Sequence, residues 1–142
     1  MPSLNFQKRF AGLVESGDKR QTIRARRRDG RDVEPGSYLY LFTGMRHRNC
    51  RRLLVRAGVD VDRVPIANRP YGHVVRCRTV DAISIDDPVL SELESCVEIG
   101  RLLLPDEAEL VARADGFESC EEMLDWFETT HDLPFEGLLI RW

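Results

Sequence analysis

The 142-residue sequence lacks a long apolar run, and no segment approaches the roughly 18–20 apolar residues that a membrane-spanning helix needs. Its first eight residues also lack the apolar core of a secretory signal peptide. We therefore expect a cytoplasmic protein with no membrane partner. In a reducing compartment its four cysteines, Cys50, Cys77, Cys96 and Cys120, are expected to remain thiols.

The spacing of a zinc site is missing as well. His47 and Cys50 lie three residues apart, but no second Cys/His pair follows at zinc-finger spacing. The other three cysteines fall in segments that we expect to be buried. We predict no metal and no cofactor.

Internal repeats, low-complexity tracts and linkers are absent too, and the chain is long enough to bury a core. We therefore predict one domain over residues 1–142. The net charge of −3 conceals an asymmetry, because residues 1–80 carry 18 Lys and Arg against 7 Asp and Glu, whereas residues 81–142 carry 3 against 17. This split favours a basic surface for an anionic partner; the alternative is that the two halves neutralise each other.

Periodicity and turn residues predict a mixed α+β protein. The helix predictions are one with an apolar stripe from Phe6 to Val14, a short basic one within 45–57, a short one at 89–93, and two that start near Pro105 and Ser119. The strand predictions are 22–28, 37–42, a long strand over 72–85 and a final strand over 137–142, with a loop over 59–70. This order does not alternate as in a doubly wound sheet, so we expect a small mixed β-barrel or strongly curved sheet.

The densest positive charge directly follows the first helix. Alternate side chains of a strand share one face. The shared face of this strand would carry Thr22, Arg24, Arg26 and Arg28. With Lys19 arriving from the turn before it, this face suits a ligand that bears a phosphate or a carbonyl group.

Two segments resemble a known family. Gly17-x-Lys19-x-x-Thr22-x-Arg24, which follows a short helix, resembles the signature of the ASCH domain, a PUA-like β-barrel group. Ala114-Asp115-Gly116-Phe117, which precedes a capped helix and a final strand, resembles that group's acidic-Gly-Phe segment. The resemblance implies a barrel with a cleft lined by the Gly-x-Lys segment, and a role in RNA or nucleoside metabolism.

Some proteins that this chain resembles are amidohydrolases that remove the acetyl group of N4-acetylcytidine with a lysine, a threonine and a glutamate. Lys19 and Thr22 match the first two positions, and Asp115, one methylene shorter than glutamate, takes the third. Under this hypothesis Thr22 attacks the acyl carbon, Lys19 is the base and Asp115 orients the lysine. The alternative is a solvated lysine, a strand threonine and an Asp-Gly pair chosen for its loop.

Binding of RNA or of a nucleotide is the leading hypothesis. Arginines bind phosphates bidentately and together give a salt-sensitive affinity, and a tyrosine can stack on an unpaired base. The residues that we expect to bind are Gly17, Lys19, Arg24, Arg26, Arg28, Arg46 and Tyr71. A third hypothesis is a ribonuclease in which Lys19 and Arg24 stabilise a pentacoordinate phosphorus. The alternative to all three is a solvated basic face.

Overall fold

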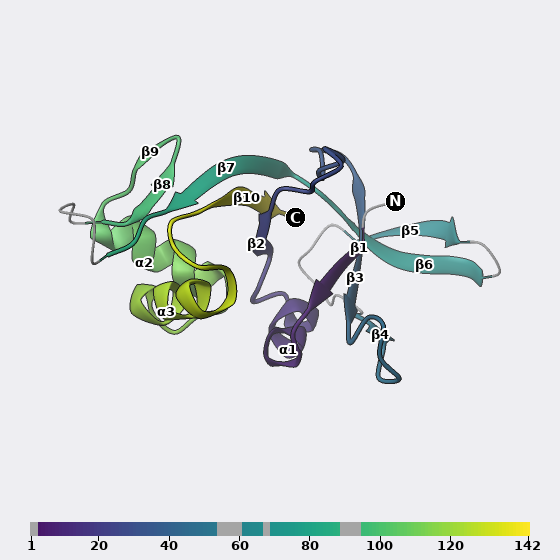
Figure 1. The fold of residues 1–142 in the computed structure, drawn as a ribbon. Coiled ribbons are helices and arrows are strands. Elements are labelled where there is room, and N and C mark those ends of the chain that lie inside the picture. The colour runs from purple at the N-terminus through teal and green to yellow at the C-terminus, as the bar shows by residue number, and fades with distance from the viewer. Residues whose placement is uncertain (1–2, 54–60, 67–68, 89–94) are drawn as a thin grey trace. The chain divides into compact units, whose positions relative to one another are not determined.

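A computed structural model describes residues 3–53, 61–66, 69–88 and 95–142, with the backbone only for 61–66 and 69–74. The elements are β1 (Ser3–Phe6), α1 (Lys8–Ser16), β2 (Gln21–Ala25), β3 (Tyr38–Thr43), β4 (Arg51–Arg52), β5 (Val61–Ile66), β6 (Arg69–Arg76), β7 (Thr79–Ile85), β8 (Val97–Ile99), β9 (Arg101–Leu102), α2 (Pro105–Ala114), α3 (Cys120–His131) and β10 (Phe135–Arg141) (Figure 1). The mixed α+β class is therefore confirmed.

The described chain divides into two compact units. Unit 1 lies within 1–20, 33–79 and 141–142, and unit 2 lies within 21–32 and 80–140. Each unit contains one five-stranded sheet, and within the described residues neither sheet closes on itself into a barrel. The single ASCH-type domain over 1–142 and its small barrel stay predictions. No described helix has the length and apolarity needed to cross a bilayer.

Unit 1 is built on a sheet in the order β1-β3-β6-β5, with β4 paired to β3. β1 runs parallel to β3, while β4 and β6 run antiparallel to it. Phe10 and Val14 on α1 are buried, as are Leu39 and Leu41 on β3. The apolar stripe thus predicted the buried face of α1, but Phe6 belongs to a separate first strand that the helical pattern did not indicate.

Unit 2 contains a sheet in the order β2-β10-β7-β8-β9 and the helices α2 and α3. Both helices start where their local signals predict. Pro105 is the first residue of α2, and the Glu107 carboxylate accepts the Leu104 N–H at 3.0 Å. Ser119 caps α3, because its Oγ accepts the Glu122 N–H at 3.1 Å. Met123 and Phe127 are the buried face of α3.

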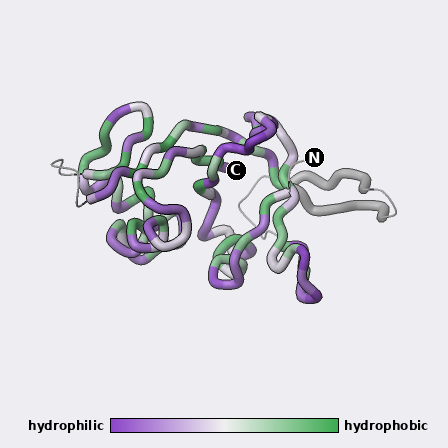
Figure 2. The backbone as a smooth tube through the Cα atoms, viewed as in Figure 1, coloured by the Kyte–Doolittle hydropathy of each residue, from purple (hydrophilic) through white to green (hydrophobic). Residues whose placement is uncertain are grey.

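The short helix predicted within 45–57 is wrong for the described residues up to 53. Gly44 and Arg46 have φ angles of 67° and 69°, which a right-handed helix does not tolerate. The segment 44–50 instead makes turns, and Arg51–Arg52 pairs with the end of β3 as β4. Figure 2 shows this turn and the loop after β2 as hydrophilic stretches of the chain.

The loop predicted over 59–70 is wrong as well, because β5 and the start of β6 form an antiparallel hairpin there. The β5–β6 register shifts between Val64 and Ile66, around Pro65, so that proline is accommodated at an irregularity of the ladder. The long strand predicted over 72–85 is two strands. Cys77 lies between β6 and β7, and its backbone forms hydrogen bonds with the backbone of Gly36 and Ser37. The helix predicted at 89–93 lies outside the described residues.

All four cysteines are free, with Cys50 exposed and Cys77 buried. Burial raises the pKa of the Cys77 thiol, and burial followed by nearby carboxylates raises the pKa of Cys96. Thiols with raised pKa values are poor nucleophiles near neutral pH. These two cysteines therefore belong to the scaffold and not to a reactive site.

Candidate functional site

The basic strand is shorter than predicted. β2 ends at Ala25, so Arg26 and Arg28 do not continue the face of Thr22 and Arg24, and that part of the prediction is wrong. The chain leaves the strand because the Arg27 N–H donates to Asp32 Oδ1 at 2.7 Å and the Arg31 N–H donates to Asp29 Oδ1 at 2.9 Å. Such side-chain acceptors favour turns over strands.

This loop is also less basic than its sequence indicates. Arg27 pairs with Asp29 at 3.0 Å, and Arg26 lies 4.0 Å from Asp32. The Arg31 N–H, followed by the Arg27 guanidinium, lowers the pKa of Asp29 below its usual value. Neither Arg28 nor the Arg31 side chain has an acidic partner among the described residues, so these two exposed guanidiniums are the ones most available to an anion.

Unit 2 contains a group of polar side chains, here called the polar cluster: the buried Gln21, Thr22 and Asp115, and the partly exposed Arg24. Arg24 Nε donates to Thr22 Oγ1 at 3.0 Å, which confirms that these two side chains share a face of β2. Gln21 Nε2 donates to Val111 O at 3.2 Å and to Asp115 Oδ1 at 3.4 Å. Asp115 follows the last turn of α2, so the cluster joins β2 to the end of that helix.

The polar cluster places the charges of Arg24 and Asp115 close to each other within unit 2. Thr22 is 4% exposed and Asp115 is 5% exposed. Burial lowers the pKa of Arg24, and the Asp115 carboxylate offsets part of that effect. Because the ordinary pKa of arginine lies so far above neutrality, Arg24 stays charged. The cluster is thus a fixed guanidinium beside a buried carboxylate, which is an arrangement that can bind an anionic or carbonyl oxygen.

His131 at the end of α3 borders this cluster. Its ring stacks on Phe127 with centroids 5.6 Å apart and lies 5.1 Å from the Phe135 ring. Burial, and then the positive charge of Arg24, lowers the pKa of His131. The sequence indicated no role for His131 or Gln21, because neither stands in a motif.

We expect the Arg24→Met substitution to raise the pKa of His131 toward its ordinary value. The substitution removes one of the two causes that disfavour the imidazolium, while the burial of the ring remains. An NMR titration of the imidazole protons measures the shift, and a His131→Gln variant assigns the signal among the three histidines. Arg26→Met removes the same charge from the exposed loop and is expected to leave this pKa unchanged. A His131 pKa that falls or stays constant in Arg24→Met would contradict the described electrostatics.

Lys19 belongs to unit 1 and is buried, with 2% of its surface exposed. Its Nζ lies 4.9 Å from the centroid of the Phe10 ring and 5.9 Å from that of Phe6. Gly17 takes a left-handed φ of 85° at the end of α1, and the Lys19 N–H returns to Leu13 O at 2.9 Å. The solvated lysine considered as an alternative is therefore wrong.

The predicted site residues are distributed over both units. Unit 1 contains Gly17, Lys19, Arg46 and Tyr71, and unit 2 contains Thr22, Arg24, Arg26, Arg28 and Asp115. Of these, the structure brings together Thr22, Arg24 and Asp115. Arg46 is exposed in the turn after β3. Tyr71 lies on β6, and its side chain is outside the described part of the chain.

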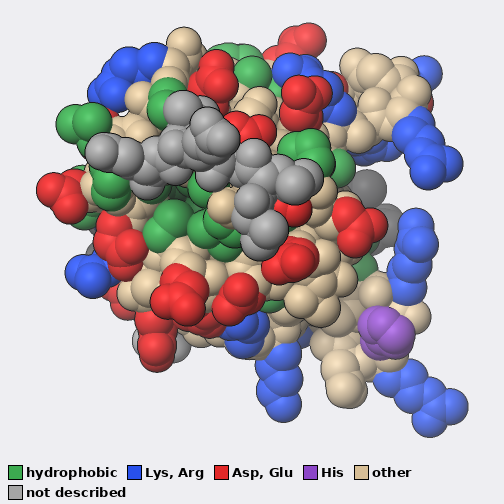
Figure 3. All heavy atoms as spheres, turned by 60° about the vertical axis from the view of Figure 1, so that its left-hand side comes forward, with side chains coloured by type: hydrophobic (Ala, Val, Ile, Leu, Met, Phe, Trp, Pro, Cys, Tyr) green, Lys and Arg blue, Asp and Glu red, His purple; other side chains and the backbone are tan. Residues whose placement is uncertain are grey.

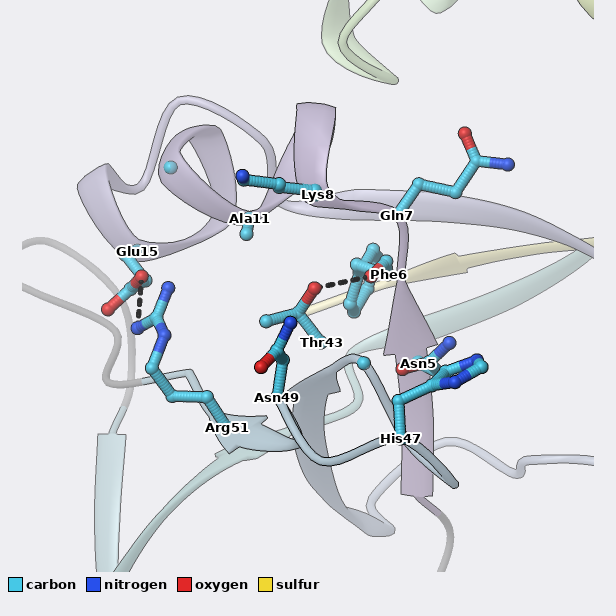
Figure 4. A pocket seen from close by; sticks show the side chains of 12 residues that line it. Asn5, Phe6, Gln7, Lys8, Ala11, Glu15, Thr43, His47, Asn49 and Arg51 are labelled. Atoms are coloured by element: carbon cyan, nitrogen blue, oxygen red, sulfur yellow. Dashed lines mark hydrogen bonds and ion pairs between the residues drawn. The ribbon is translucent and has the colours of Figure 1, made fainter.

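Unit 1 also contains a pocket of about 720 Å³ that the sequence did not indicate, here called the α1 pocket (Figure 4). Its walls come from the end of β1, the exposed side of α1, the turn after β3 and β4. Arg51 on β4 forms an ion pair with Glu15 on α1 at 2.7 Å, and this pair lies at one side of the pocket. Two stretches of the chain, 5–15 and 43–51, build this pocket, so no single local motif marks it.

Acidic side chains gather on the face turned forward in Figure 3, which carries α2 and α3, in keeping with the 17 acidic residues of 81–142. No protein family, no curated protein and no solved structure matches this chain. The function therefore has to be inferred from the polar cluster, the arginines and the resemblance of the two motifs.

Proposed function

We propose that this chain is an ASCH-type, PUA-like domain that binds RNA or a nucleotide, and that Arg24 contacts the ligand. The observation that carries the proposal is the partly exposed but desolvated Arg24 guanidinium, held by Thr22 Oγ1 beside Asp115. The elements of the two motifs also form as the resemblance implies: a short helix that ends at Gly17, and a capped helix and a final strand after Asp115. The PUA-like barrel is part of the same proposal.

The chemistry of the polar cluster favours binding over a purely structural role. Burying a charged side chain costs several kcal/mol, and apolar side chains of similar volume often stabilise a fold as well as a buried ion pair does. A guanidinium fixed by its Nε is preorganised for the oxygens of a phosphate or of a base. The alternative is a structural ion pair that only connects β2 to α2.

The salt dependence of RNA affinity tests the contribution of the arginine loop. We expect Arg28→Ala to weaken binding of a short single-stranded RNA and to reduce the slope of log affinity against log salt by about 0.7, the value for one lost phosphate contact. Arg27→Ala is the matched control, because Arg27 is already paired with Asp29, and its effect is expected to be smaller. Arg26→Ala, with Asp32 at 4.0 Å, is expected to fall between the two.

Fluorescence anisotropy at several salt concentrations measures these slopes, and a gel at the end shows that the RNA stays intact. An unchanged slope in both Arg26→Ala and Arg28→Ala would exclude the loop from the interface. Cleaved RNA would instead favour the ribonuclease hypothesis.

A second candidate function is an amidohydrolase that deacylates a modified nucleoside such as N4-acetylcytidine. The observation that favours it is the burial of all three residues that the resemblance implies as catalytic: Lys19, Thr22 and Asp115 are 2%, 4% and 5% exposed. In that reaction Thr22 Oγ would form a bond to the acyl carbon, with its proton taken by Lys19. The C–N bond then breaks, the amine of cytidine leaves with a proton, and water hydrolyses the acyl-threonine.

Incubation of the purified protein with N4-acetylcytidine distinguishes the two candidates. Release of cytidine and acetate that disappears in Lys19→Ala and in Thr22→Val, with both variants folded, would establish the amidohydrolase. Release that persists in Thr22→Val would rule out the threonine as nucleophile. If the protein binds RNA but releases no product from N4-acetylcytidine, the result favours RNA binding over deacylation of this nucleoside.

A further inference from the structure

The α1 pocket is independent of the polar cluster, because all the residues that line it belong to unit 1. Its volume of about 720 Å³ lies in the range of small-molecule sites. Figure 4 shows Thr43 and Asn49 between the Glu15–Arg51 pair on one side and His47 on the other, with Lys8 on the α1 side. Side chains from two stretches of the chain, 5–15 and 43–51, thus converge on one cavity.

Three side chains at the α1 pocket carry hydrogen-bond donors that no described residue engages. Lys8, His47 and Asn49 line it, and within the described chain their side chains have no hydrogen-bond or ion-pair partner. Glu15 is the acidic residue among the lining side chains, and Arg51 neutralises it at 2.7 Å. No acidic residue stands in the first turn of α1 to offset Lys8. This set of donors, with a surplus of positive charge, matches an anionic oxygen and not a cation.

The backbone of the turn after β3 holds the donor Asn49 in place. Gly44 turns the chain with a φ of 67°, and a Cβ at this position would lie 2.9 Å from Asn49 O. The His47 N–H donates to Gly44 O at 3.0 Å, which closes the turn. The close approach of Gly44 and Asn49 preorganises this wall of the pocket.

The floor of the pocket is apolar but exposes very little surface. Phe6 and Ala11 line it and are buried, with 2% and 4% of their surfaces exposed. Thr43 Oγ1 donates its proton to Phe6 O at 2.8 Å. The oxygen lone pairs of this hydroxyl can therefore accept a hydrogen bond from a ligand. A ligand with an anionic end and an organic part that carries hydroxyl groups matches the donors and the Thr43 hydroxyl.

We propose that the α1 pocket binds a small phosphate monoester, with the phosphate near Lys8 and Asn49 and a hydroxyl group of the organic part at Thr43. The site does not require the polar cluster or the RNA-binding function. A nucleoside monophosphate is the largest ligand that we expect to bind here, and it supplies both the phosphate and the hydroxyl groups.

Isothermal titration of the full chain with uridine 5′-monophosphate tests the proposal. We expect Lys8→Gln and Asn49→Leu each to weaken binding by about tenfold or more, because each removes a hydrogen bond to a charged group. Arg9→Gln is the matched control. Arg9 is the next residue of α1 and carries the same charge, but it does not line the pocket, so its affinity is expected to stay within about twofold of the wild type.

Uridine, which lacks the phosphate, is expected to bind at least about tenfold more weakly, and so is inorganic phosphate, which lacks the organic part. The dependence on Lys8 and Asn49 separates this site from the polar cluster, because a nucleotide held at Arg24 would not respond to either substitution. The proposal is overturned if the wild type does not bind the nucleotide, if uridine binds equally well, or if Arg9→Gln weakens binding as much as Lys8→Gln. Loss of binding in Arg24→Met alone would place the nucleotide in unit 2 and also overturn it.

Discussion

Arg24→Met is expected to weaken the affinity for single-stranded RNA by about a hundredfold, the largest functional effect that we predict for a single side chain. A hydrogen-bonded contact between charged groups contributes about 1.5–3 kcal/mol, and about 2.7 kcal/mol corresponds to this factor. The guanidinium is already fixed by Thr22 Oγ1, so binding costs little side-chain entropy and the loss on substitution is correspondingly large. Methionine keeps most of the apolar stem and removes the charge.

Two further variants are controls for the loss of a positive charge and for the loss of the hydrogen bond to Arg24. Arg113→Met removes one exposed arginine from α2, also in unit 2, and is expected to change RNA affinity little. Thr22→Val keeps the shape of Thr22, removes the hydroxyl that holds Arg24 Nε, and is expected to produce a smaller loss than Arg24→Met. Circular dichroism and the unfolding midpoint verify that each variant is folded. Equal RNA affinities for Arg24→Met and the wild type would show that the polar cluster is a structural ion pair.

The largest stability effect is expected for Gly137→Ala on β10. A Cβ at Gly137 would collide with the carbonyl oxygen of Arg24, which is a backbone atom, and would lie 2.7 Å from Cζ of the Phe135 ring. Neither neighbour can yield without moving β2 or a buried side chain. We therefore expect a destabilisation of about 3 kcal/mol, at the upper end of the cost of overpacking.

Urea unfolding measures this change, and Gly12→Ala provides a comparison with the opposite sign. Gly12 lies inside α1 and a Cβ there would meet no atom within 4 Å, so alanine is expected to stabilise the chain by up to about 1 kcal/mol through helix propensity. If Gly137→Ala unfolded at the same urea concentration as the wild type, β2 and β10 would not approach each other as closely as described.

The helices of unit 2 could be predicted from the sequence because their start signals are local. A proline followed by two acidic residues begins α2, and a Ser-x-x-Glu segment caps α3. The hairpin of β5 and β6 could not be predicted in the same way. Strand pairing depends on partners elsewhere in the chain, and the proline at 65, which favours a loop locally, stands where the ladder is irregular.

In the polar cluster, contacts between residues near in sequence could be predicted, whereas contacts between distant residues could not. The contact between Thr22 and Arg24 follows from their spacing of two residues on one strand. Asp115 bonds to Gln21, which stands 94 residues earlier in the sequence, and only the resemblance of the acidic-Gly-Phe segment pointed to it. The burial of Lys19 depends on Gly17, whose left-handed turn returns the chain to α1 and two phenylalanine rings.

The order of the two units along the chain has a practical consequence for dissecting this protein. The sequence passes between them four times, after Arg20, Asp32, Thr79 and Ile140, so neither unit is encoded by one continuous stretch of DNA. The last two residues, Arg141 and Trp142, belong with the amino-terminal part, and the Trp142 N–H bonds to Arg20 O at 3.0 Å. A carboxy-terminal deletion of two residues therefore removes part of the unit that contains Lys19.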